Sequence, residues 1–366
     1  MQALILVGGE GTRLRPLTCT VPKPVVPLAN QPHITLMIEW LRGHGVDEIV
    51  LSCGFLAHGV RRTLGEHPVA GVTVRYVEEP RPLGTGGALR YAGGLLDERF
   101  LMLNGDVLAD FDLSAQLAQH ERTGARATLA LYPVEDPSAY GLVRLREDGR
   151  VAGFLEKPRP EEIDTNLINA GVYVLERSVL EVMPPPGSHV SIEREVFPKL
   201  VDDGLYGRLS QGYWADIGTP ARYLQATFDI LESVVRSDTG SRLRAAGGLM
   251  ADGASVEGRL IPPALIGPGS RLAPGALVGG RVSLGRGVAI AEGARIEDAV
   301  VLDGASVGPR ATIRNSILGP GVRVGEACQL DGALLGEGVE LGAGNVLRAG
   351  ARVFPGVRLP AGAIRG

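Results

Sequence analysis

The sequence predicts two domains of different classes: an α/β domain with a Rossmann-like, mainly parallel sheet, followed by a parallel β-helix. Three observations predict this organisation. In the first part of the chain, apolar strand patterns alternate with helical patterns, which is typical of a sheet covered by helices on both faces. From about Leu265, aliphatic residues recur instead at every sixth position. The chain has 366 residues, which is enough for two domains with substantial cores.

The expected elements of the first domain follow one another in a regular order. Residues 3–7 are a continuous apolar run, as in a strand that is buried on both faces. The next expected elements are a helix at 35–44, a strand at 48–53, a helix at 58–64, strands at 73–77 and 100–106, a helix at 113–124 and a strand at 127–134. In sheets of this kind, ligands bind beyond the carboxyl ends of the strands.

The expected β-helix rests on the spacing of its aliphatic residues. They are six apart at Ile266, Leu272, Val278, Leu284, Ile290 and Ile296, and later segments align at a spacing of 17. In such hexapeptide repeats each hexad forms one short strand with its aliphatic residue pointing inward. We expect the first domain at 1–240, a linker and first irregular coil at 241–264, and the β-helix at 265–366.

Composition argues against several classes of partner. The 41 acidic residues outnumber the 37 basic ones, and the net charge of −4 does not favour nucleic acid or an anionic membrane. Cys19, Cys53 and Cys328 are widely spaced and odd in number, which suggests reduced thiols and no zinc site. The amino-terminal apolar run is too short for a signal peptide or a membrane span. These features predict a cytoplasmic protein.

The loop after the first strand, GGEGTRLRPLTCTVPKP at 8–24, combines glycines, cations and prolines. The glycines are Gly8, Gly9 and Gly11, and the cations are Arg13, Arg15 and Lys23. The glycines allow backbone N–H groups to approach a ligand closely, and the cations bring positive charge to the same place. The spacing matches neither the dinucleotide fingerprint nor the Walker pattern. We call this segment the signature loop, and it predicts an anionic ligand, most simply a phosphate.

The complete set of motifs resembles the sugar-1-phosphate nucleotidyltransferases, the sugar-nucleotide pyrophosphorylases. After the signature loop come LGTGGAL at 83–89, LNGD at 103–106, FLEKP at 154–158, NAGVY at 169–173, VSIEREVFP at 190–198 and WADIGTP at 214–220. Within the family, the chain is most similar to the mannose-1-phosphate guanylyltransferase branch. The resemblance implies a catalytic domain of the nucleotide-diphospho-sugar transferase type and a left-handed β-helix that serves in structure or homo-oligomer formation.

The resemblance also implies the reaction. A sugar 1-phosphate attacks the α-phosphorus of a nucleoside triphosphate in the presence of Mg²⁺, and pyrophosphate leaves. GTP and mannose 1-phosphate are the favoured substrates, because the glutamine-bearing loop usual in the thymidylyl branch is absent. Two alternatives stay open: the same reaction with glucose 1-phosphate and UTP, dTTP or ATP, and a non-catalytic regulatory subunit that binds a sugar nucleotide. Acetyl transfer by the β-helix is disfavoured, since no histidine follows His189.

The residues that would bind the nucleotide and metal are likewise carried over from the family. Arg13 and Lys23 are expected to hold the triphosphate. The expected nucleotide contacts are Gly8, Gly9, Gly11, Thr12, Arg13, Lys23, Gly84 and Thr85. Asp106 and Asp216 are the expected metal ligands, which agrees with the preference of Mg²⁺ for one or two carboxylates plus phosphate oxygens. Asp110 and Asp112 are expected to be turn or helix N-cap residues instead.

The expected sugar-phosphate residues are Gly141, Glu156, Lys157 and Asn169. Glu156 would accept sugar hydroxyls while Lys157 meets the phosphate. Neighbouring residues on a strand point to opposite faces, so both can reach one ligand only if the strand ends or bends at this point, which Pro158 favours. Glu193 is expected to be an acid at a helix N-terminus.

Overall fold

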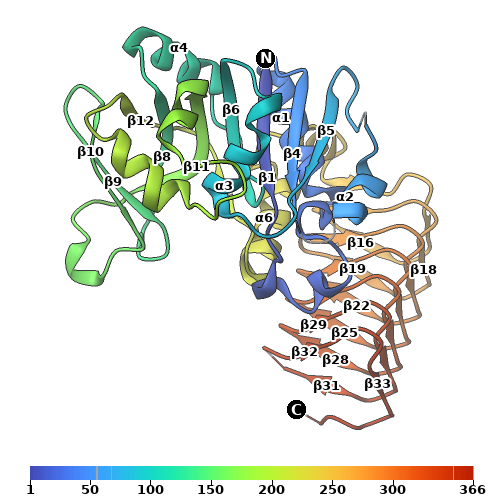
Figure 1. Ribbon diagram of the computed structural model, residues 1–366. Coiled ribbons are helices and arrows are strands. Elements are labelled where there is room, and N and C mark those ends of the chain that lie inside the picture. The colour runs from blue at the N-terminus through green and yellow to red at the C-terminus, as the bar shows by residue number, and fades with distance from the viewer. Residues whose placement is uncertain (55–56, 67, 349, 366) are drawn as a thin grey trace. The chain divides into compact units, whose positions relative to one another are not determined.

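The structure, a computed structural model, describes residues 1–54, 57–66, 68–348 and 350–365 (Figure 1). The chain divides into two compact units, each built from two segments. The sheet unit contains Met1–Glu10 and Ile34–Trp214, and the β-helix unit contains Gly11–His33 and Ala215–Gly366. The signature loop therefore begins in the sheet unit, and from Gly11 onward it is part of the β-helix unit.

A nine-stranded mixed sheet forms the centre of the sheet unit. Its parallel part consists of β5 (Thr73–Glu78), β4 (Glu48–Cys53), β1 (Gln2–Val7) and β6 (Arg99–Asn104). The long strand β11 (Leu167–Glu176) runs antiparallel to β6 and to β8 (Ala127–Pro133), and β12 (Leu205–Leu209) is parallel to β8. The hairpin of β9 (Gly141–Leu145) and β10 (Val151–Glu156) is antiparallel. The predicted Rossmann-like class is confirmed, with an antiparallel extension on one side.

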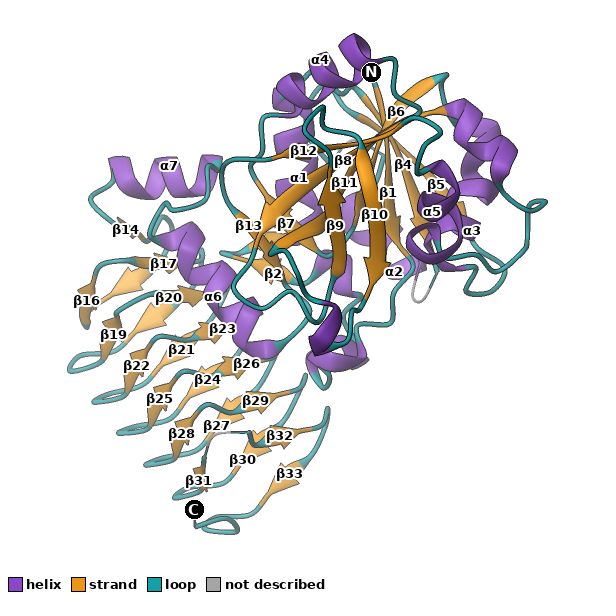
Figure 2. Cartoon of the chain, turned by 90° about the vertical axis from the view of Figure 1, so that its left-hand side faces the viewer, coloured by secondary structure: helices purple, strands orange, loops and turns teal. Residues whose placement is uncertain are grey.

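Helices pack on this sheet, as Figure 2 shows. They are α1 (His33–Gly43), α2 (Ala57–Leu64), α3 (Gly84–Ala92), α4 (Leu113–Thr123) and α5 (Phe197–Leu200). Leu4 of β1 joins a buried cluster that contains residues of α3 and α5, while its neighbour Ile5 is equally buried outside that cluster. Strand β1 is thus buried on both faces, as predicted.

Helix α4 begins and ends where its sequence predicts. The Asp112 carboxylate accepts a hydrogen bond of 3.0 Å from the Ala115 N–H, which makes Asp112 the N-cap. Gly124, at φ 61°, ends the helix in the left-handed conformation that glycine adopts without strain. Asp110 instead accepts a hydrogen bond of 2.7 Å from the Tyr213 N–H.

The β-helix unit is dominated by three parallel sheets (Figures 1 and 2). The first contains β14 (Leu249–Met250), β17 (Ala264–Ile266), β20 (Val282–Leu284), β23 (Val300–Val301), β26 (Ile317–Leu318), β29 (Leu334–Leu335) and β32 (Arg352–Val353). The second contains β15 (Ser255–Val256), β18 (Arg271–Leu272), β21 (Ala289–Ile290), β24 (Ser306–Val307), β27 (Arg323–Val324), β30 (Glu340–Leu341) and β33 (Arg358–Leu359). The third contains β16 (Arg259–Ile261), β19 (Leu277–Gly279), β22 (Arg295–Glu297), β25 (Thr312–Arg314), β28 (Gln329–Asp331) and β31 (Val346–Leu347).

The repeat in the sequence explains this architecture. All six aliphatic residues predicted to point inward, from Ile266 to Ile296, belong to the buried core of the β-helix. Successive coils pair in register, as Ala264 does with Val282 and Val300 does with Ile317. The predicted parallel β-helix is confirmed, and its three sheets are typical of the left-handed type. The domain limits at 240 and 264 stay a prediction.

The rest of the β-helix unit consists of short elements at its beginning and two helices. The signature loop forms the single turns η1 (Thr12–Leu14), η2 (Leu17–Cys19) and η3 (Lys23–Val25), followed by the hairpin of β2 (Pro27–Leu28) and β3 (Gln31–Pro32). Helices α6 (Pro220–Leu231) and α7 (Asp238–Ala245) precede the first coil. The Tyr223 hydroxyl of α6 donates a hydrogen bond of 2.5 Å to the Pro27 carbonyl, which ties the hairpin to α6.

Candidate active site

The signature loop folds back on itself at Gly11. Gly11 has φ 63°, and its carbonyl accepts a hydrogen bond of 2.7 Å from the Thr18 hydroxyl. A Cβ atom at Gly11 would lie 3.1 Å from both Lys23 Cβ and Thr18 Cγ2. The positive φ favours glycine here, and the close approach of Lys23 leaves little room for a side chain. The turn brings Lys23 beside the segment that carries Thr12 and Arg13.

Asp216 lies next to Arg13 in the same unit. One Asp216 oxygen accepts a hydrogen bond of 2.7 Å from the Gly218 N–H, and the other accepts one of 2.8 Å from Arg222. Arg13 Nη2 lies 3.7 Å from the second oxygen. The Asp216 side chain is 12% exposed, whereas that of Arg13 is 58% exposed. The carboxylate is thus held in place while most of the Arg13 side chain stays accessible to a ligand.

Arg222 was not identified from the sequence. It lies in the first turn of α6, where its backbone N–H bonds to the N-cap residue Thr219 and its side chain reaches back to Asp216. The only local signal for it is the Thr-Pro pair at 219–220, which marks a helix start and so places a nearby arginine on the turn that follows WADIGTP.

Asp106 and Asp216, the two expected metal ligands, belong to different compact units. Asp106 follows the carboxyl end of β6 in the sheet unit. Among the described residues there is no group of three or more histidine, cysteine and acidic side chains that could hold a metal by itself. Mg²⁺ needs only one or two protein carboxylates, because phosphate oxygens and water supply its other ligands. A carboxylate has about four lone-pair positions, so the hydrogen bonds of Asp216 leave room for a metal ion.

LNGD ends in a tight approach of two strands. The Gly105 N–H donates a hydrogen bond of 2.9 Å to the Leu6 carbonyl, and a Cβ atom at Gly105 would lie 2.5 Å from that oxygen. Glycine is therefore required between Asn104 and Asp106. This contact holds the start of the Asp106 turn against the carboxyl end of β1.

Gly8 and Gly9 meet different surroundings at the end of β1. A Cβ atom at Gly8 would lie 3.1 Å from Glu79 Oε1, and one at Gly54 would lie 2.9 Å from the Gly8 carbonyl. Glu79 in turn accepts hydrogen bonds of 3.1 Å from the Ser52 hydroxyl and the Leu83 N–H. Nothing lies within 4 Å of a Cβ atom built at Gly9, so its surroundings are open.

The LGTGGAL motif docks against the VSIEREVFP motif. The Val190 carbonyl accepts hydrogen bonds from the N–H groups of Gly86 and Gly87, at 2.9 and 3.1 Å. Gly84 has φ 74°, and a Cβ atom there would lie 2.5 Å from the same carbonyl. The Thr85 hydroxyl donates a hydrogen bond of 2.6 Å to Glu193. The glycines thus allow two backbone segments to approach each other closely, and the hydrogen bond from Thr85 stabilises this contact.

Glu193 has a larger part in the site than its sequence position indicates. It lies in the first turn of η7 (Ile192–Val196), where Ser191 is the N-cap, so its predicted place at a helix N-terminus is confirmed. Its carboxylate also accepts a hydrogen bond of 2.8 Å from the Ser191 hydroxyl, in addition to that from Thr85. The bond between Thr85 and Glu193 joins two motifs that are 108 residues apart.

Glu156 and Lys157 occupy the end of strand β10. Glu156 is the last residue of the strand, and Lys157 has φ 52°, so the strand direction changes between them as the two roles require. Burial and then the negative charge of Glu193 raise the pKa of the Glu156 carboxyl, although Lys157 opposes this effect. A Cβ atom at Gly141 would lie 2.9 Å from Glu156 Oε2, so glycine leaves room for that carboxylate.

Asn169 lies where β11 bulges, and it belongs to a chain of polar side chains. Its amide donates a hydrogen bond of 2.8 Å to the hydroxyl of Tyr173, whose full burial raises the pKa of the phenol well above its usual value. Asn104 of the LNGD motif lies beside Gly171, since a Cβ atom there would be 2.9 Å from the Asn104 amide nitrogen. Asn104 Oδ1 is buried and has no hydrogen-bond partner among the described residues. Such an oxygen favours a bound donor, for example a hydroxyl group.

Comparison with known proteins supports the motifs. The nucleotidyl transferase family model matches residues 2–233, and the GMPPB C-terminal domain model matches residues 260–360. A mannose-1-phosphate guanylyltransferase of Mycobacterium tuberculosis is 43% identical over 100% of this chain and 97% of its own length. The catalytic subunit beta of the zebrafish (Danio rerio) mannose-1-phosphate guanylyltransferase is 39% identical over 69% of this chain and 70% of its own.

Further similarities extend beyond that branch. A UTP–glucose-1-phosphate uridylyltransferase of Synechocystis sp. is 32% identical over 86% of each chain. The crystal structure of HddC from Yersinia pseudotuberculosis complexed with GMP-PN matches with a TM-score of 0.53 and 29% identity, over 62% of this chain and 97% of that one. The family predicted from the motifs is confirmed, and this chain belongs to the sugar-1-phosphate nucleotidyltransferases.

Proposed function

We propose that the protein transfers the guanylyl group of GTP to mannose 1-phosphate, giving GDP-mannose and pyrophosphate. The observation that carries the reaction class is the signature loop, in which Lys23 lies against Gly11, two residues before a mostly exposed Arg13. The choice of substrates is supported by relatives named mannose-1-phosphate guanylyltransferase, one of which matches along nearly its whole length.

The reaction needs positioning and charge neutralisation more than a general base. The attacking oxygen of the sugar phosphate is already an anion, and it displaces pyrophosphate from the α-phosphorus of GTP. Holding the two reactants in line is worth an effective molarity on the order of 10⁵ M or more. Arg13 would hold the triphosphate by a forked contact and Lys23 as a point charge, which reduces the repulsion between two polyanions. Gly8, Gly9, Gly11, Thr12, Gly84 and Thr85 would line the nucleotide.

Asp106 and Asp216 would hold Mg²⁺, which neutralises charge on the phosphates and on the departing pyrophosphate. Arg222 and the Gly218 N–H orient Asp216 for this role. The sugar would bind to Glu156 and Asn169, with Gly141 leaving space beside it. Lys157 would meet the phosphate of the sugar. A hydroxyl-rich ligand suits this region, because it offers a carboxylate and a buried acceptor that has no partner among the described residues.

A second candidate keeps the reaction and changes the substrates. The relative named UTP–glucose-1-phosphate uridylyltransferase favours UTP with glucose 1-phosphate, and dTTP or ATP would use the same chemistry. A third candidate is a regulatory subunit that binds a sugar nucleotide without turnover. The presence of Arg13, Lys23, Asp106 and Asp216 favours an active enzyme.

Other features concern the protein's setting. We propose a cytoplasmic homo-oligomer that associates through the β-helix, without nucleic-acid or membrane partners. The three cysteines, all of them free, agree with a reducing compartment. Within the described residues, no helix has the length and apolar character needed to cross a membrane.

The deciding experiment is pyrophosphate release by the purified protein with Mg²⁺. GTP, dTTP, UTP, CTP and ATP are each combined with mannose 1-phosphate and with glucose 1-phosphate. We expect the fastest release with GTP and mannose 1-phosphate. A different preferred pair would support the second candidate, and the absence of release from every pair, with sugar nucleotide still binding, would support the regulatory one.

A further inference from the structure

The outward side of the first β-helix sheet differs from the other two sheets. Its outward column is apolar in the middle and buried, with Leu265 8%, Val300 1%, Ile317 1% and Leu334 3% exposed. The corresponding column of the second sheet includes exposed arginines, at Arg271, Arg323 and Arg358. Burial of an outward apolar column requires that other residues cover it. Within the same unit, α6 packs against β20 of this sheet.

The segment that follows the signature loop is attached to this sheet at β20. The Asn30 amide donates a hydrogen bond of 2.6 Å to the Leu284 carbonyl, and the Ser283 hydroxyl donates one of 2.9 Å to Asn30 Oδ1. Ala29 and Asn30, at φ 46° and 63°, form the tip of the hairpin of β2 and β3. The hairpin thus presents its tip to the β-helix.

The signature loop itself is attached to the same sheet at β32. Arg352 is the first residue of β32 and pairs in register with Leu334 of the preceding coil. Its guanidinium Nη1 donates hydrogen bonds of 3.2 and 2.9 Å to the carbonyls of Arg13 and Arg15. These carbonyls flank Leu14, which is fully buried, so the backbone of η1 is held on both sides of that residue.

The two attachments hold the loop at Arg13 and Arg15 and the hairpin that follows it at Asn30, all on one stiff sheet. Strands β20 and β32 are four steps apart in the sheet, which is about 19 Å at about 4.8 Å a step. In a parallel β-helix every coil is bonded to its neighbours, so this distance changes little. The carbonyls that Arg352 holds belong to the residue whose side chain is proposed to meet the triphosphate and to the residue two positions later.

We propose that Arg352 is a positioning residue for nucleotide binding: from the last turns of the β-helix it fixes the backbone of the signature loop so that Arg13 meets the triphosphate. This assignment depends on the proposed function for the role of Arg13. It gives the β-helix a part in substrate binding in addition to support and assembly. Arg352 does not touch substrate, and it acts through the loop.

The test compares Arg352→Ala with Arg323→Ala. Arg323 is also exposed and also begins a two-residue strand, but its side chain pairs with Glu340 on the second sheet. We expect Arg352→Ala to raise the KM and the calorimetric Kd for GTP about tenfold, which corresponds to about 1.4 kcal/mol. The KM for mannose 1-phosphate should change by less than about twofold, because the residues proposed to bind the sugar belong to the sheet unit, whereas Arg352 belongs to the β-helix unit. Arg323→Ala should match the wild type.

Two further measurements separate positioning from support. Arg352→Lys keeps the charge, but its shorter side chain does not place a donor where Nη1 of Arg352 makes both hydrogen bonds. This variant should therefore recover about a third of the lost GTP affinity. The melting temperature and the oligomer mass of Arg352→Ala should equal those of the wild type. Unchanged GTP binding, or a loss shared equally by both substrates, would overturn the proposal. So would a loss that follows a lower melting temperature.

The outcome can be distinguished from a failure of the proposed function. If the wild type turns over no pair of substrates, the enzyme assignment fails, whereas calorimetry with GTP on the wild type and Arg352→Ala still tests Arg352. If the wild type prefers another nucleotide, the same titrations are made with that nucleotide. Equal affinities of the two proteins then overturn the positioning role, and a selective loss in the variant supports it.

Discussion

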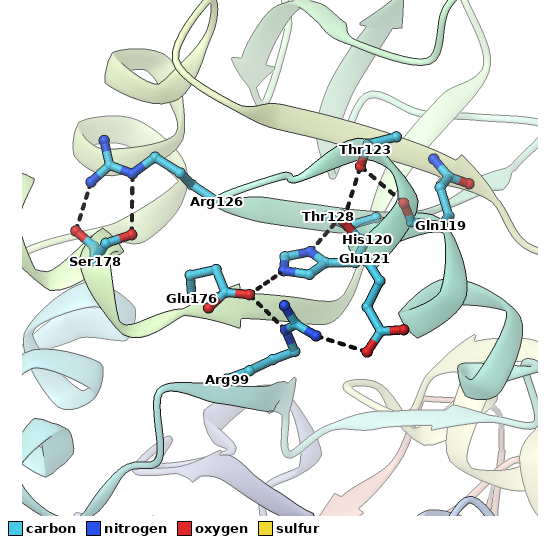
Figure 3. A network of polar contacts seen from close by, with 9 residues as sticks. All are labelled: Arg99, Gln119, His120, Glu121, Thr123, Arg126, Thr128, Glu176 and Ser178. Carbon is cyan, nitrogen blue, oxygen red and sulfur yellow. Dashed lines mark hydrogen bonds and ion pairs between the residues drawn. The ribbon is translucent and has the colours of Figure 1, made fainter.

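The two ends of strand β6 carry polar clusters of opposite character. At its amino end, Arg99 lies in the network of charged and hydrogen-bonded side chains that Figure 3 shows. Glu176 Oε1 accepts a hydrogen bond of 2.6 Å from Arg99 and lies 3.0 Å from His120 Nε2. His120 Nδ1 lies 2.8 Å from the Thr128 hydroxyl, and Arg99 also pairs with Glu121 at 2.8 Å.

At the carboxyl end of β6, by contrast, one buried polar atom, Asn104 Oδ1, has no hydrogen-bond partner among the described residues. The pKa of the Glu156 carboxyl is set by burial and by neighbouring charges, with no hydrogen bond among its causes. After burial, the largest influence on the Glu156 carboxyl is the negative charge of another acid, Glu193, and both raise its pKa. Buried polar groups normally have hydrogen-bond partners. We therefore interpret the amino-end network as structural and predict that a ligand completes the carboxyl-end cluster.

The largest expected effect that would test this contrast is that of Asp106→Asn, just beyond the carboxyl end of β6. Because the change removes one charge of the proposed metal site and keeps the shape, turnover should fall about 10²- to 10³-fold. The measurement is pyrophosphate release at saturating Mg²⁺. Asp112→Asn is the matched control, since asparagine caps helix α4 as well as aspartate does. Near-normal turnover of Asp106→Asn would contradict the metal assignment.

At the other end of β6, His120→Ala should damage stability and leave catalysis intact. The fully buried ring would be lost together with its contacts to Thr128 and Glu176, so the free energy of unfolding should fall by about 3 kcal/mol. Urea unfolding measures this, with the exposed His58→Ala as control. Turnover per folded molecule should equal that of the wild type. A lower kcat in a protein of unchanged stability would place the network in the active site.

Much of the fold is predictable because local patterns determine it. The six-residue spacing from Ile266 to Ile296 specifies the inward face of the β-helix, and Asp112 and Gly124 mark the ends of α4. The antiparallel insertion of β11 between β6 and β8 is not predictable in this way. Strand pairing depends on contacts between distant segments, and an apolar strand has the same pattern in either direction.

The same distinction between local patterns and contacts of distant segments applies to the candidate site. Motifs identify the glycines, cations and acids, because each motif is a local pattern. The bond between Thr85 and Glu193 and the reach of Arg222 to Asp216 depend on how distant or helical segments dock, so the sequence did not reveal them. That Asn104 Oδ1 has no partner in the described part of the chain is a property of the packed structure. The individual roles of the site residues stay predictions, which the variants above and below test.

A smaller effect is expected for Glu156→Gln. This variant tests whether Glu156 serves substrate binding or the stability of the fold. The carboxylate should accept sugar hydroxyls more strongly than an amide does, so kcat/KM for mannose 1-phosphate should fall about tenfold. Stability should be equal or higher, since a buried negative charge facing Glu193 is removed. Glu162→Gln, which alters an exposed pair with Arg159, is the control. A clear loss of stability in Glu156→Gln would instead make Glu156 part of the framework.

The smallest expected effect is a difference in how pH acts on the two clusters. Burial lowers the pKa of His120, although Glu176 opposes it. The unfolded chain therefore binds this proton more readily, so the stability that His120 contributes is lost as pH falls below 6.5, the ordinary pKa of histidine. The pKa of Glu156 is raised, so the folded protein binds that proton more readily and gains stability as pH falls through the raised pKa toward 4.5.

Melting temperatures measured from pH 7.5 down to pH 5 can separate the two terms. As pH falls, the advantage of the wild type over His120→Ala should shrink, while its melting temperature relative to Glu156→Gln should rise, each by on the order of 1 °C. Opposite signs are expected because burial disfavours the charged form of both groups. Histidine is charged when it is protonated, whereas glutamate is charged when it is deprotonated. If both differences changed in the same direction, at least one group would be in a different protonation state, and the contrast between the two ends of β6 would no longer hold.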